Sequence, residues 1–436
     1  MQLSRYCKIY PKKDKSETFI LFSTKEASII EANRPYIESI RKNRLPKKEK
    51  EELLELGIIV DDLKKERTEM LHFVDDINSI NNIFRAYVAL NLDCNLACRY
   101  CFEGTRKGKH YMTKETADSF VEFVKRRTAD SKGIDEINLV FYGGEPLLSS
   151  EMIIYISKRI KEFVKRKGMN YSFSIITNGT LLTKKNVDKL KSFGLKDVSV
   201  TVDGPENIHN SYRPFKSGRG SFDVIFKNVK KVCEIVDIQI GGNYTKDNYS
   251  RFPLLLDYMM DNGLTPDKVS DVRFDFVTKE SEGVAPPDFR EGVLSLNEPW
   301  LFDANIFLRE EILKRGYKAQ RVMPVACMIE FKERMLINYD GSIYKCPGLI
   351  GRKEFCVGNV KTGIKDYTKS HNLYNWKNDE CLDCSYLPLC FGGCRYMKLV
   401  RDGNMNGVDC KKPFFDATLE ALVKQDIKYG LTDGSK

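Results

Sequence analysis

Three cysteines, Cys94, Cys98 and Cys101, lie close together in the segment LDCNLACRYCFEG, with the spacing C-x3-C-x2-C. Thiolates are soft metal ligands, and three of them on one short loop suit a [4Fe–4S] cluster. A structural zinc site normally needs a fourth ligand, and no further ligand lies nearby in the sequence. Three ligands on a four-iron cluster leave one iron open, and that iron can bind a substrate or a cofactor.

A second group of cysteines follows near the C-terminus. Its spacings are Cys327-x13-Gly341-x4-Cys346 and Cys381-x2-Cys384-x5-Cys390-x3-Cys394, and Cys410 follows after 15 further residues. Periodic helix or strand patterns are short in this region, so we expect it to depend on bound metal to fold. The C-x2-C and C-x3-C pairs also leave a zinc ribbon open as an alternative.

Cysteine usage in the whole chain favours metal ligation over disulfides. The chain has 13 cysteines, an odd number, and its first residues lack the apolar stretch of a signal peptide. The cytosol keeps thiols reduced, so we expect a cytoplasmic protein without disulfides. The sequence contains no run of 18 apolar residues, so a membrane span is not expected. Cys7 and Cys233 have no patterned partner, and we expect them to be buried free thiols.

The elements that must position the first cysteines alternate between apolar runs and amphipathic stretches. The apolar runs are residues 86–92, 137–144, 173–179, 198–204, 238–244 and 272–278, and the helical patterns lie near 113–128, 150–167, 183–193, 221–235 and 250–262. Alternating strands and helices predict a parallel sheet with right-handed crossovers, and near-continuous apolar strands predict burial on both faces. Six repeats predict an α/β fold with a partial (β/α)6 TIM-like barrel. The functional residues should then lie at the C-terminal ends of the strands.

The residues before the barrel form a separate unit. Strands are expected near Tyr6–Pro11 and Thr18–Phe22, helices from Lys25 to Leu56, and a short strand at 58–60 after a helix end at Gly57. Short strands and small helices in this span fit a winged-helix-like module. The predicted organisation is residues 1–83 for this module, 84–280 for the barrel, 281–320 for a linker with one helix, and 321–436 for the cysteine-rich domain.

Cys94, Cys98 and Cys101, with Tyr100 before the last cysteine, resemble the signature of the radical S-adenosylmethionine (SAM) superfamily. The resemblance also covers the barrel pattern from about residue 84 to 280. It implies that SAM chelates the open iron through its amino and carboxylate groups. It further implies that one electron from the cluster cleaves SAM to methionine and a 5′-deoxyadenosyl radical, which abstracts a hydrogen atom from the substrate. In such a site the protein positions and shields the cofactor.

The same resemblance assigns SAM-binding residues at the strand ends. Gly143, Gly144 and Glu145 of YGGEP resemble the glycine-rich motif at the SAM amine, where glycines let the backbone approach a ligand and a carboxylate can meet an ammonium. The other assigned contacts are Tyr100 near the adenine, Thr177 and Asn178 after the third strand, Thr201 after the fourth, and Arg213 at the SAM carboxylate or ribose. Asp203 and Asn243 are candidates to line the site, or turn and capping residues.

The C-terminal cysteines resemble the seven-cysteine pattern of SPASM domains, whose relatives hold two auxiliary [4Fe–4S] clusters. By position, Cys381, Cys384, Cys390 and Cys410 would ligate the outer cluster, and Cys327, Cys346 and Cys394 the inner one. The cofactors implied are therefore SAM and three [4Fe–4S] clusters. Some relatives supply a fourth inner ligand six residues before the first cysteine, where this chain has Arg321. The inner cluster is then either open at one iron or bound by Cys356.

The first functional hypothesis is a maturase of ribosomally made peptides. The N-terminal module resembles the precursor-recognition element of many such maturases, which binds a leader peptide by strand addition to a sheet edge. An open inner cluster could bind a peptide cysteine, whose sulfur would then couple to a carbon radical and form a thioether crosslink. Carbon–carbon crosslinking or epimerisation would share the first step. A flavodoxin or ferredoxin is the expected electron donor.

Two alternatives remain. An anaerobic sulfatase-maturing enzyme oxidises Ser or Cys to formylglycine, and such relatives carry an aspartate directly after the second SPASM cysteine, where this chain has Pro347. They also generally lack such an N-terminal module, so this hypothesis ranks second. The other alternative is a DNA-binding regulator with redox-sensing clusters, because the net charge is +10 and the module is winged-helix-like. It leaves the strand-end residues unexplained. The basic residues are scattered along helical segments, so nucleic acid is not expected as a partner.

Overall fold

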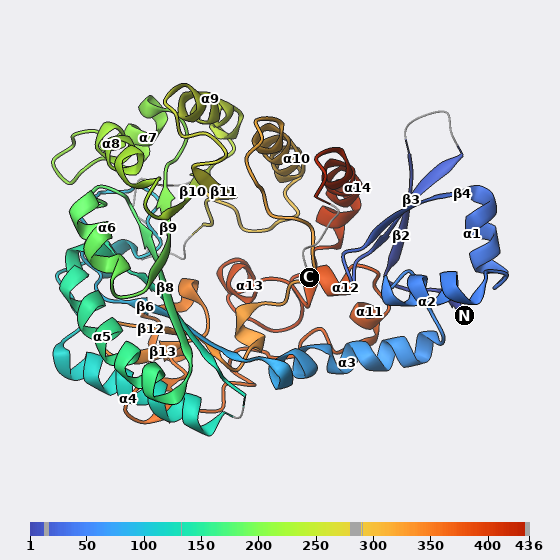
Figure 1. The fold of residues 1–436 in the computed structure, drawn as a ribbon, viewed down its shortest axis with the longest axis horizontal. Helices are drawn as coiled ribbons and strands as arrows, with labels where there is room; N and C mark the ends of the chain where they lie inside the picture. The colour runs from blue at the N-terminus through green and yellow to red at the C-terminus, as the bar shows by residue number, and fades with distance from the viewer. Residues whose placement is uncertain (13–16, 132, 280–288, 290, 432–436) are drawn as a thin grey trace.

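A single large sheet forms the left part of the molecule as seen in Figure 1. The computed structural model describes residues 1–12, 17–131, 133–279, 289 and 291–431. The sheet has ten strands in the order β11-β10-β9-β8-β7-β6-β12-β13-β14-β15. The six parallel strands of the barrel are β6 (Ile83–Ala89), β7 (Glu136–Tyr142), β8 (Asn170–Thr177), β9 (Leu195–Thr201), β10 (Asp237–Tyr244) and β11 (Val269–Phe276). The predicted partial barrel of six strands is confirmed.

Helices cover the outer, convex face of this sheet. They are α4 (Lys114–Asp130), α5 (Ser150–Lys167), α6 (Lys184–Lys191), α7 (Glu206–Tyr212), α8 (Phe222–Val232) and α9 (Pro253–Asp261). Thr113 caps α4 by accepting a hydrogen bond from the Thr116 N–H, as is favourable at a helix start. Apolar side chains of the helices and of the outward-facing strand positions form the largest hydrophobic core.

The concave face of the sheet differs from the sequence expectation. Along β6, Phe84 and Ala86 are buried in the core, whereas Arg85 and Tyr87 line a cavity of about 530 Å³ inside the barrel. Alternation with period two places every second side chain on this inner face. Burial on both faces, as the sequence predicted, holds for β7, which is buried from Ile137 to Tyr142, but not for β6.

The cysteine-rich region extends the barrel sheet. Strand β12 (Arg334–Ile337) pairs in parallel with β6, and β13 (Ser342–Tyr344), β14 (Gly358–Asn359) and β15 (Gly363–Ile364) follow in antiparallel order. Pairing between positions so far apart in the sequence leaves no local signal. Beyond these strands the region holds short helices, α11 (Asp379–Leu382), α12 (Leu387–Cys390) and α13 (Arg395–Asp402).

The N-terminal unit is a small sheet with three helices. Strands β2 (Cys7–Pro11), β3 (Thr18–Ser23) and β4 (Ile29–Asn33) form an antiparallel sheet, and β1 (Gln2–Leu3) pairs with β5 (Ile59–Val60). The helices are α1 (Arg34–Arg41), α2 (Lys47–Glu55) and α3 (Leu63–Ile80). Residues 29–33 were expected in a helix, but they complete the sheet by pairing with β3, and Asn33 then caps α1. Gly57 follows α2 with a φ of +64°, as the sequence predicted for a helix end.

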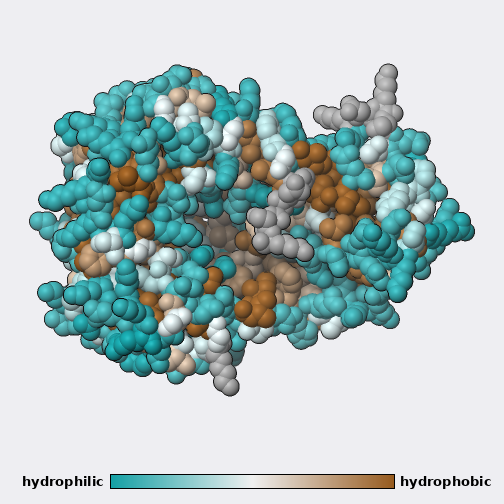
Figure 2. Space-filling model, viewed as in Figure 1, coloured by the Kyte–Doolittle hydropathy of each residue, from teal (hydrophilic) through white to brown (hydrophobic). Residues whose placement is uncertain are grey.

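Two further helices lie between the barrel and the N-terminal unit (Figure 1). Helix α10 (Pro299–Lys314) packs along α14 (Lys412–Lys428), and the N-terminal sheet packs on α14 through Ile20, Phe22 and Leu419. Figure 2 shows this face of the molecule hollowed between the barrel and the N-terminal unit, with hydrophobic residues gathered around the hollow. No helix in the described part of the chain has the length and apolar character that crossing a bilayer requires.

Candidate active site

The first three cysteines follow β6 on a loop that the barrel holds in place. Cys94, Cys98 and Cys101 line one cavity of about 300 Å³ at the C-terminal ends of the strands. The Ala97 N–H donates to the Pro214 carbonyl (2.8 Å), which ties the loop to the segment after α7. The sequence prediction that these residues would meet at the strand ends agrees with this geometry.

The electrostatics around these thiols suit anionic sulfur. Burial raises the pKa of Cys94, Cys98 and Cys101, so without compensation the thiols would stay protonated. Lys107 lies beside them with a hydrogen bond to Cys101. Burial acts to lower the pKa of Lys107, but the three neighbouring sulfurs outweigh it and raise that pKa above its ordinary value. A metal cluster adds further positive charge and deprotonates its ligands. Three soft donors, a lysine and a shared cavity therefore fit a [4Fe–4S] cluster.

The two glycines of YGGEP are required by contact between backbones. A Cβ atom on Gly143 would lie 2.3 Å from the Asn91 carbonyl oxygen, and one on Gly144 would lie 2.1 Å from the Asp93 carbonyl oxygen. Gly143 also has a φ of +133°, which residues with side chains rarely adopt. Both glycines line the cavity, but their size is dictated by the cysteine loop that passes over them. The sequence predicts that the glycines let the backbone approach a ligand, whereas the groups that require them here are backbone carbonyls of the chain leading into the cysteine loop.

Glu145 holds two strand ends together. Its fully buried carboxylate accepts hydrogen bonds from the Thr177 hydroxyl (2.7 Å), the Asn178 N–H (2.8 Å) and the Leu147 N–H (3.0 Å). Burial raises the pKa of Glu145, while these donors favour the charged form. Thr177 and Asn178 line the cavity beside the cysteines, and Glu145 fixes their positions. The carboxylate thus has three local donors, and its predicted contact with the SAM ammonium stays a prediction.

Arg213 lines the same cavity and carries a buried donor without a partner among the described residues. Its Nη1 donates to the Tyr100 hydroxyl (2.7 Å), and the Tyr100 hydroxyl in turn donates to Asp203. Asn243 donates to the Tyr100 hydroxyl (3.1 Å) from β10. The Nε atom of Arg213 is buried and has no hydrogen-bond partner among the described residues. A buried unpaired donor that lines a cavity fits an oxygen of a bound ligand, such as the carboxylate or ribose of SAM.

Most of the remaining predicted residues line the same cavity. The cavity wall includes Tyr100, Thr201 and Asn243, as the sequence predicted, whereas Asp203 lies behind Tyr100 in the network above. The wall also includes residues that the sequence argument missed. These are Phe102, Glu103, Lys107, Tyr142, Ile176, Phe276, Val277 and Thr278. Their positions directly after the cysteines or at strand ends are the signal that could have found them.

Glu103 and Tyr142 are the most informative of the missed residues. Both Glu103 carboxylate oxygens and the Tyr142 hydroxyl are buried without hydrogen-bond partners among the described residues. Burial raises the pKa of Glu103 to about 7. Tyr142 packs in the same hydrophobic cluster as Cys346 and Cys394, so it separates the cavity from the inner cysteine set.

The inner cysteines gather behind this wall. Burial raises the pKa of Cys346, and the neighbouring thiols of Cys327 and Cys394 raise it further. Cys356 packs in the same cluster, but its thiol donates to the Gly358 carbonyl (3.1 Å). The Arg321 guanidinium donates to the Ala27 carbonyl in the N-terminal unit. The structure thus brings three thiols of the inner set together, and the thiol of Cys356 is engaged elsewhere.

The outer cysteines surround a cavity of their own. Cys381, Cys384, Cys390 and Cys410 all line a cavity of about 500 Å³ in the C-terminal region. The Asn378 side chain caps α11 by accepting from the Cys381 N–H (3.0 Å), and the Cys384 N–H donates to the Cys381 carbonyl. Four thiols around one cavity fit a second iron–sulfur cluster. Within the described ranges, no three His, Cys, Asp or Glu side chains are arranged to hold a single metal ion.

Comparison with known proteins identifies the class. Residues 90–249 match the family model described as the Radical SAM superfamily. The match begins just before the cysteine loop and ends after β10. The chain therefore contains a radical SAM domain and is a radical SAM enzyme.

Relatives extend the similarity over most of the chain. A cysteine-type anaerobic sulfatase-maturating enzyme of Clostridium novyi is 26% identical, over 76% of this chain and 93% of its own length. The radical SAM cyclopropyl synthase TigE of Paramaledivibacter caminithermalis is 24% identical, over 82% of this chain and 78% of its own length. None of the relatives named here is described as a DNA-binding regulator.

Two solved structures share the fold. Native anSMEcpe with bound AdoMet superposes with a TM-score of 0.62 at 19% identity, covering 78% of this chain and 98% of that one. Streptococcus suis SuiB bound to S-adenosylmethionine gives a TM-score of 0.54 at 17% identity, covering 94% of this chain and 98% of that one. The fold is therefore that of these enzymes.

Proposed function

We propose that the chain is a maturase that forms a thioether crosslink in a ribosomally made precursor peptide. The observation that carries this proposal is the position of the inner cysteine set, with Cys346 behind Tyr142 on the wall of the SAM cavity. A peptide thiol bound at an open inner iron would lie beside the site where a carbon radical forms. When bound, SAM would supply the acceptor for the carbon-bound hydrogen atom and the inner cluster would accept one electron, while the thiol proton would pass to solvent, which together balance the two hydrogens lost when the C–S bond forms.

The chain's own residues bind and orient the reacting groups. Under this proposal Arg213 and the Tyr100 network hold the SAM carboxylate or ribose, and the backbone at Gly143 and Gly144 lies against SAM. Thr201, Thr177 and Asn178 complete that wall. Cys94, Cys98 and Cys101 ligate the first cluster, Cys327, Cys346 and Cys394 the inner one, and Cys381, Cys384, Cys390 and Cys410 the outer one.

The N-terminal unit is proposed to bind the leader of the precursor. Its sheet ends in two edge strands, β2 and β4, and a sheet edge can accept an added peptide strand. A related fold supports a peptide substrate, since SuiB has been solved bound to its precursor peptide SuiA. We further propose a cytoplasmic location and a flavodoxin or ferredoxin as electron donor.

Sulfatase maturation is the second candidate, and the similarity to sulfatase-maturating enzymes favours it. Such an enzyme would need a proton acceptor near the SAM cavity, and the residue after Cys346 is Pro347, which offers none. Glu103 is a buried carboxylate on the cavity wall that could take this place.

Mass spectrometry of the product separates the two candidates. The reconstituted enzyme is incubated with SAM, dithionite and synthetic peptides encoded by short reading frames beside the gene, and separately with a sulfatase peptide that carries the target cysteine. A product lighter by two hydrogens, with a fragmentation block between the cysteine and a second residue, supports the thioether. Conversion of the cysteine of the sulfatase peptide to an aldehyde, with no change in the peptides encoded beside the gene, would support the second candidate instead.

A further inference from the structure

Strand β11 ends the sheet with an open edge. The Val277 N–H donates to the Tyr244 carbonyl (2.9 Å) on the β10 side, so alternate residues of β11 direct their backbone groups to β10. Val272, Phe274 and Phe276 direct theirs to the other side, where the Val272 N–H donates to the Lys318 carbonyl (3.0 Å). In the described ranges, Phe274 and Phe276 have no backbone partner on that side. Unpaired edge groups of this kind can pair with an added strand.

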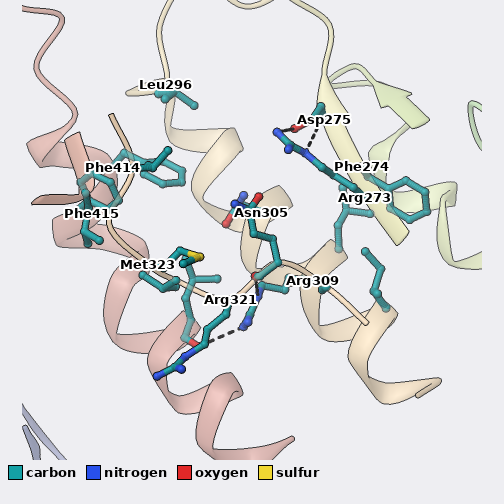
Figure 3. Close-up of a pocket in the computed structure, with 18 of the residues that line it drawn as sticks. Arg273, Phe274, Asp275, Leu296, Asn305, Arg309, Arg321, Met323, Phe414 and Phe415 are labelled. Atoms are coloured by element: carbon teal, nitrogen blue, oxygen red, sulfur yellow. Dashed lines mark hydrogen bonds and ion pairs between the residues drawn. The ribbon is translucent and has the colours of Figure 1, made fainter. Parts of the chain in front are cut away.

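A largely apolar pocket lies beside this edge (Figure 3). Its volume is about 350 Å³, and Val272 to Asp275 of β11 form one wall. Helix α10 contributes Leu308, and α14 contributes Phe414 and Phe415 on the opposite side. Figure 3 shows Phe274 on the strand and Phe414 and Phe415 across the pocket from it.

The rim of the pocket exposes apolar surface. Met323 and Val325 line the pocket and are each 53% exposed, although both are large hydrophobic residues. The charged side chains here are largely paired, Arg273 with Asp275 (2.8 Å) and Arg309 with Asp426. Exposed apolar residues around a concave site mark a surface where another molecule binds.

The edge leads from the pocket to the SAM cavity. Phe274 lines the pocket, whereas Phe276, two residues further along β11, lines the SAM cavity. At about 3.3 Å per residue, a strand paired with β11 would advance about 7 Å between these positions. Arg273 and Asp275 also line the cavity inside the barrel, and that cavity shares Thr201 and Asn243 with the SAM cavity.

The other end of the pocket adjoins the N-terminal unit. Val322 and Phe415 line the pocket and pack with Ile20 and Phe22 of β3. Arg321, also on the pocket wall, donates to the Ala27 carbonyl of the same unit. The pocket therefore adjoins the N-terminal unit at one end and the part of β11 that leads to the SAM cavity at the other.

We propose that the open edge of β11 and the adjoining pocket dock the segment of the peptide substrate that joins its leader to the modified residue. The segment adds to β11 as an extended strand through Phe274 and Phe276, and one of its apolar side chains fills the pocket. This inference rests on the proposed function, because it takes a peptide as the substrate.

A matched pair of variants at one position tests the backbone pairing. Phe274→Pro removes the outward N–H together with the phenyl ring, whereas Phe274→Ala removes the ring alone, so their difference reports the N–H. The probes are peptides enriched from an mRNA-displayed library of random 20-residue peptides on the reconstituted wild-type enzyme, then synthesised with a fluorophore. We expect Phe274→Pro to bind these peptides about fivefold to tenfold more weakly than Phe274→Ala, as for one amide hydrogen bond.

A second pair tests the pocket. Asn305 lines it from α10, and Asp303 is exposed on the same helix. Asn305→Trp fills the pocket and is expected to weaken peptide binding at least tenfold, whereas Asp303→Trp leaves it unchanged. Iron content and SAM cleavage without peptide are measured for every variant, to show that the first cluster and its cofactor site are intact.

Hydrogen exchange tests the same pairing in the wild-type enzyme, so this test does not depend on the folding of a variant. The amides of Phe274 and Phe276 should exchange rapidly in the free enzyme and become protected when an enriched peptide is added. Protection in the free enzyme, from another part of the chain or from a second copy at high concentration, would overturn the inference. Equal peptide affinity of Phe274→Pro and Phe274→Ala would also overturn the inference. In that case, if the enzyme still modifies the peptides, the proposed function stands. If the library yields no peptide that the enzyme binds or modifies, both proposals fail.

Discussion

The side-chain amide of Asn178, at the end of β8, donates a hydrogen bond to the Sγ atom of Cys94, 3.6 Å away. The backbone N–H of Asn178 donates in turn to Glu145, which follows β7. A chain of contacts thus connects the ends of three neighbouring strands, β6, β7 and β8. The orientation of the first cysteine therefore depends on contacts among these three strand ends, and a change at Asn178 or Glu145 should reach the cluster.

Iron content should report three separate clusters. Three [4Fe–4S] clusters require about 12 iron atoms per chain, and the triple variant Cys94→Ala, Cys98→Ala, Cys101→Ala should retain about 8. The outer cysteines surround a separate cavity, and the inner cysteines Cys346 and Cys394 lie in a separate hydrophobic cluster. Both sets should therefore bind iron independently of the first three cysteines. The measurement is iron and sulfide per chain after anaerobic reconstitution. Zinc in place of iron would contradict the assignment.

Gly143→Ala should prevent the cysteine loop from closing over the strand ends. The added Cβ would meet the Asn91 carbonyl at 2.3 Å, and the φ of +133° would be strained as well. We expect the variant to lose most of the iron of the first cluster. Its free energy of unfolding should be lower by about 2–4 kcal/mol. Gly241→Ala is the control, because its Cβ would meet nothing closer than 3.8 Å in the same sheet. A Gly143→Ala enzyme with full iron content would contradict the packing argument.

The sequence predicted the strand ends well because that signal is local. Each apolar run is followed by its functional residues, so the order of residues along the chain is enough to place Cys94, Thr177 and Thr201 at one edge of the sheet. The contacts that give these residues their roles are long-range and were missed. The carboxylate of Glu145 binds neighbouring strand ends, and β12 joins β6 across more than two hundred residues of chain. The open edge of β11 likewise depends on which strand lies last in the sheet.

Arg213→Lys should weaken SAM binding at least tenfold. Arginine presents a planar fork that donates to Tyr100 through Nη1 and leaves its buried Nε without a partner among the described residues, and lysine has no second donor in that geometry. A tenfold loss corresponds to about 1.4 kcal/mol. Equilibrium binding of SAM to the reconstituted enzyme measures the effect, and Arg219→Lys, at an exposed position of the same segment, should bind as the wild type does. Unchanged SAM affinity of Arg213→Lys would remove Arg213 from the site.

Acidification should destabilise the barrel through His209. The ring is buried, its Nδ1 accepts from the Asp203 N–H (3.1 Å), and Nε2 contacts the Ser221 hydroxyl (3.0 Å). Burial, and then the charge of Arg213, lower the pKa of His209 well below 6.5. Between that lowered value and about 6.5 the unfolded chain binds the extra proton, so stability falls as the pH falls, by about 1.4 kcal/mol per pH unit.

Denaturant midpoints at pH 7.5 and 5.5 measure this effect. The difference between the two midpoints should shrink in His209→Gln, which cannot take up the proton. His72 is exposed on α3, so His72→Gln should keep the difference of the wild type. An undiminished difference in His209→Gln would assign the acid sensitivity to other groups.

Asp426→Ala should loosen the contact between α10 and α14. The Asp426 carboxylate is fully buried and pairs with Arg309, which also donates to the Gln425 side chain (2.9 Å) and the Leu422 carbonyl (3.2 Å). Removing the carboxylate leaves a buried guanidinium without its counter-charge, which costs about 3–5 kcal/mol. The exposed pair Lys189–Glu151 is the control, and Glu151→Ala should cost less than about 1 kcal/mol. Helices α10 and α14 also line the pocket beside β11. Because the contact between them is loosened, a protease should cleave α14 faster in Asp426→Ala than in the wild type. Unchanged cleavage would show that the ion pair does not hold these helices together.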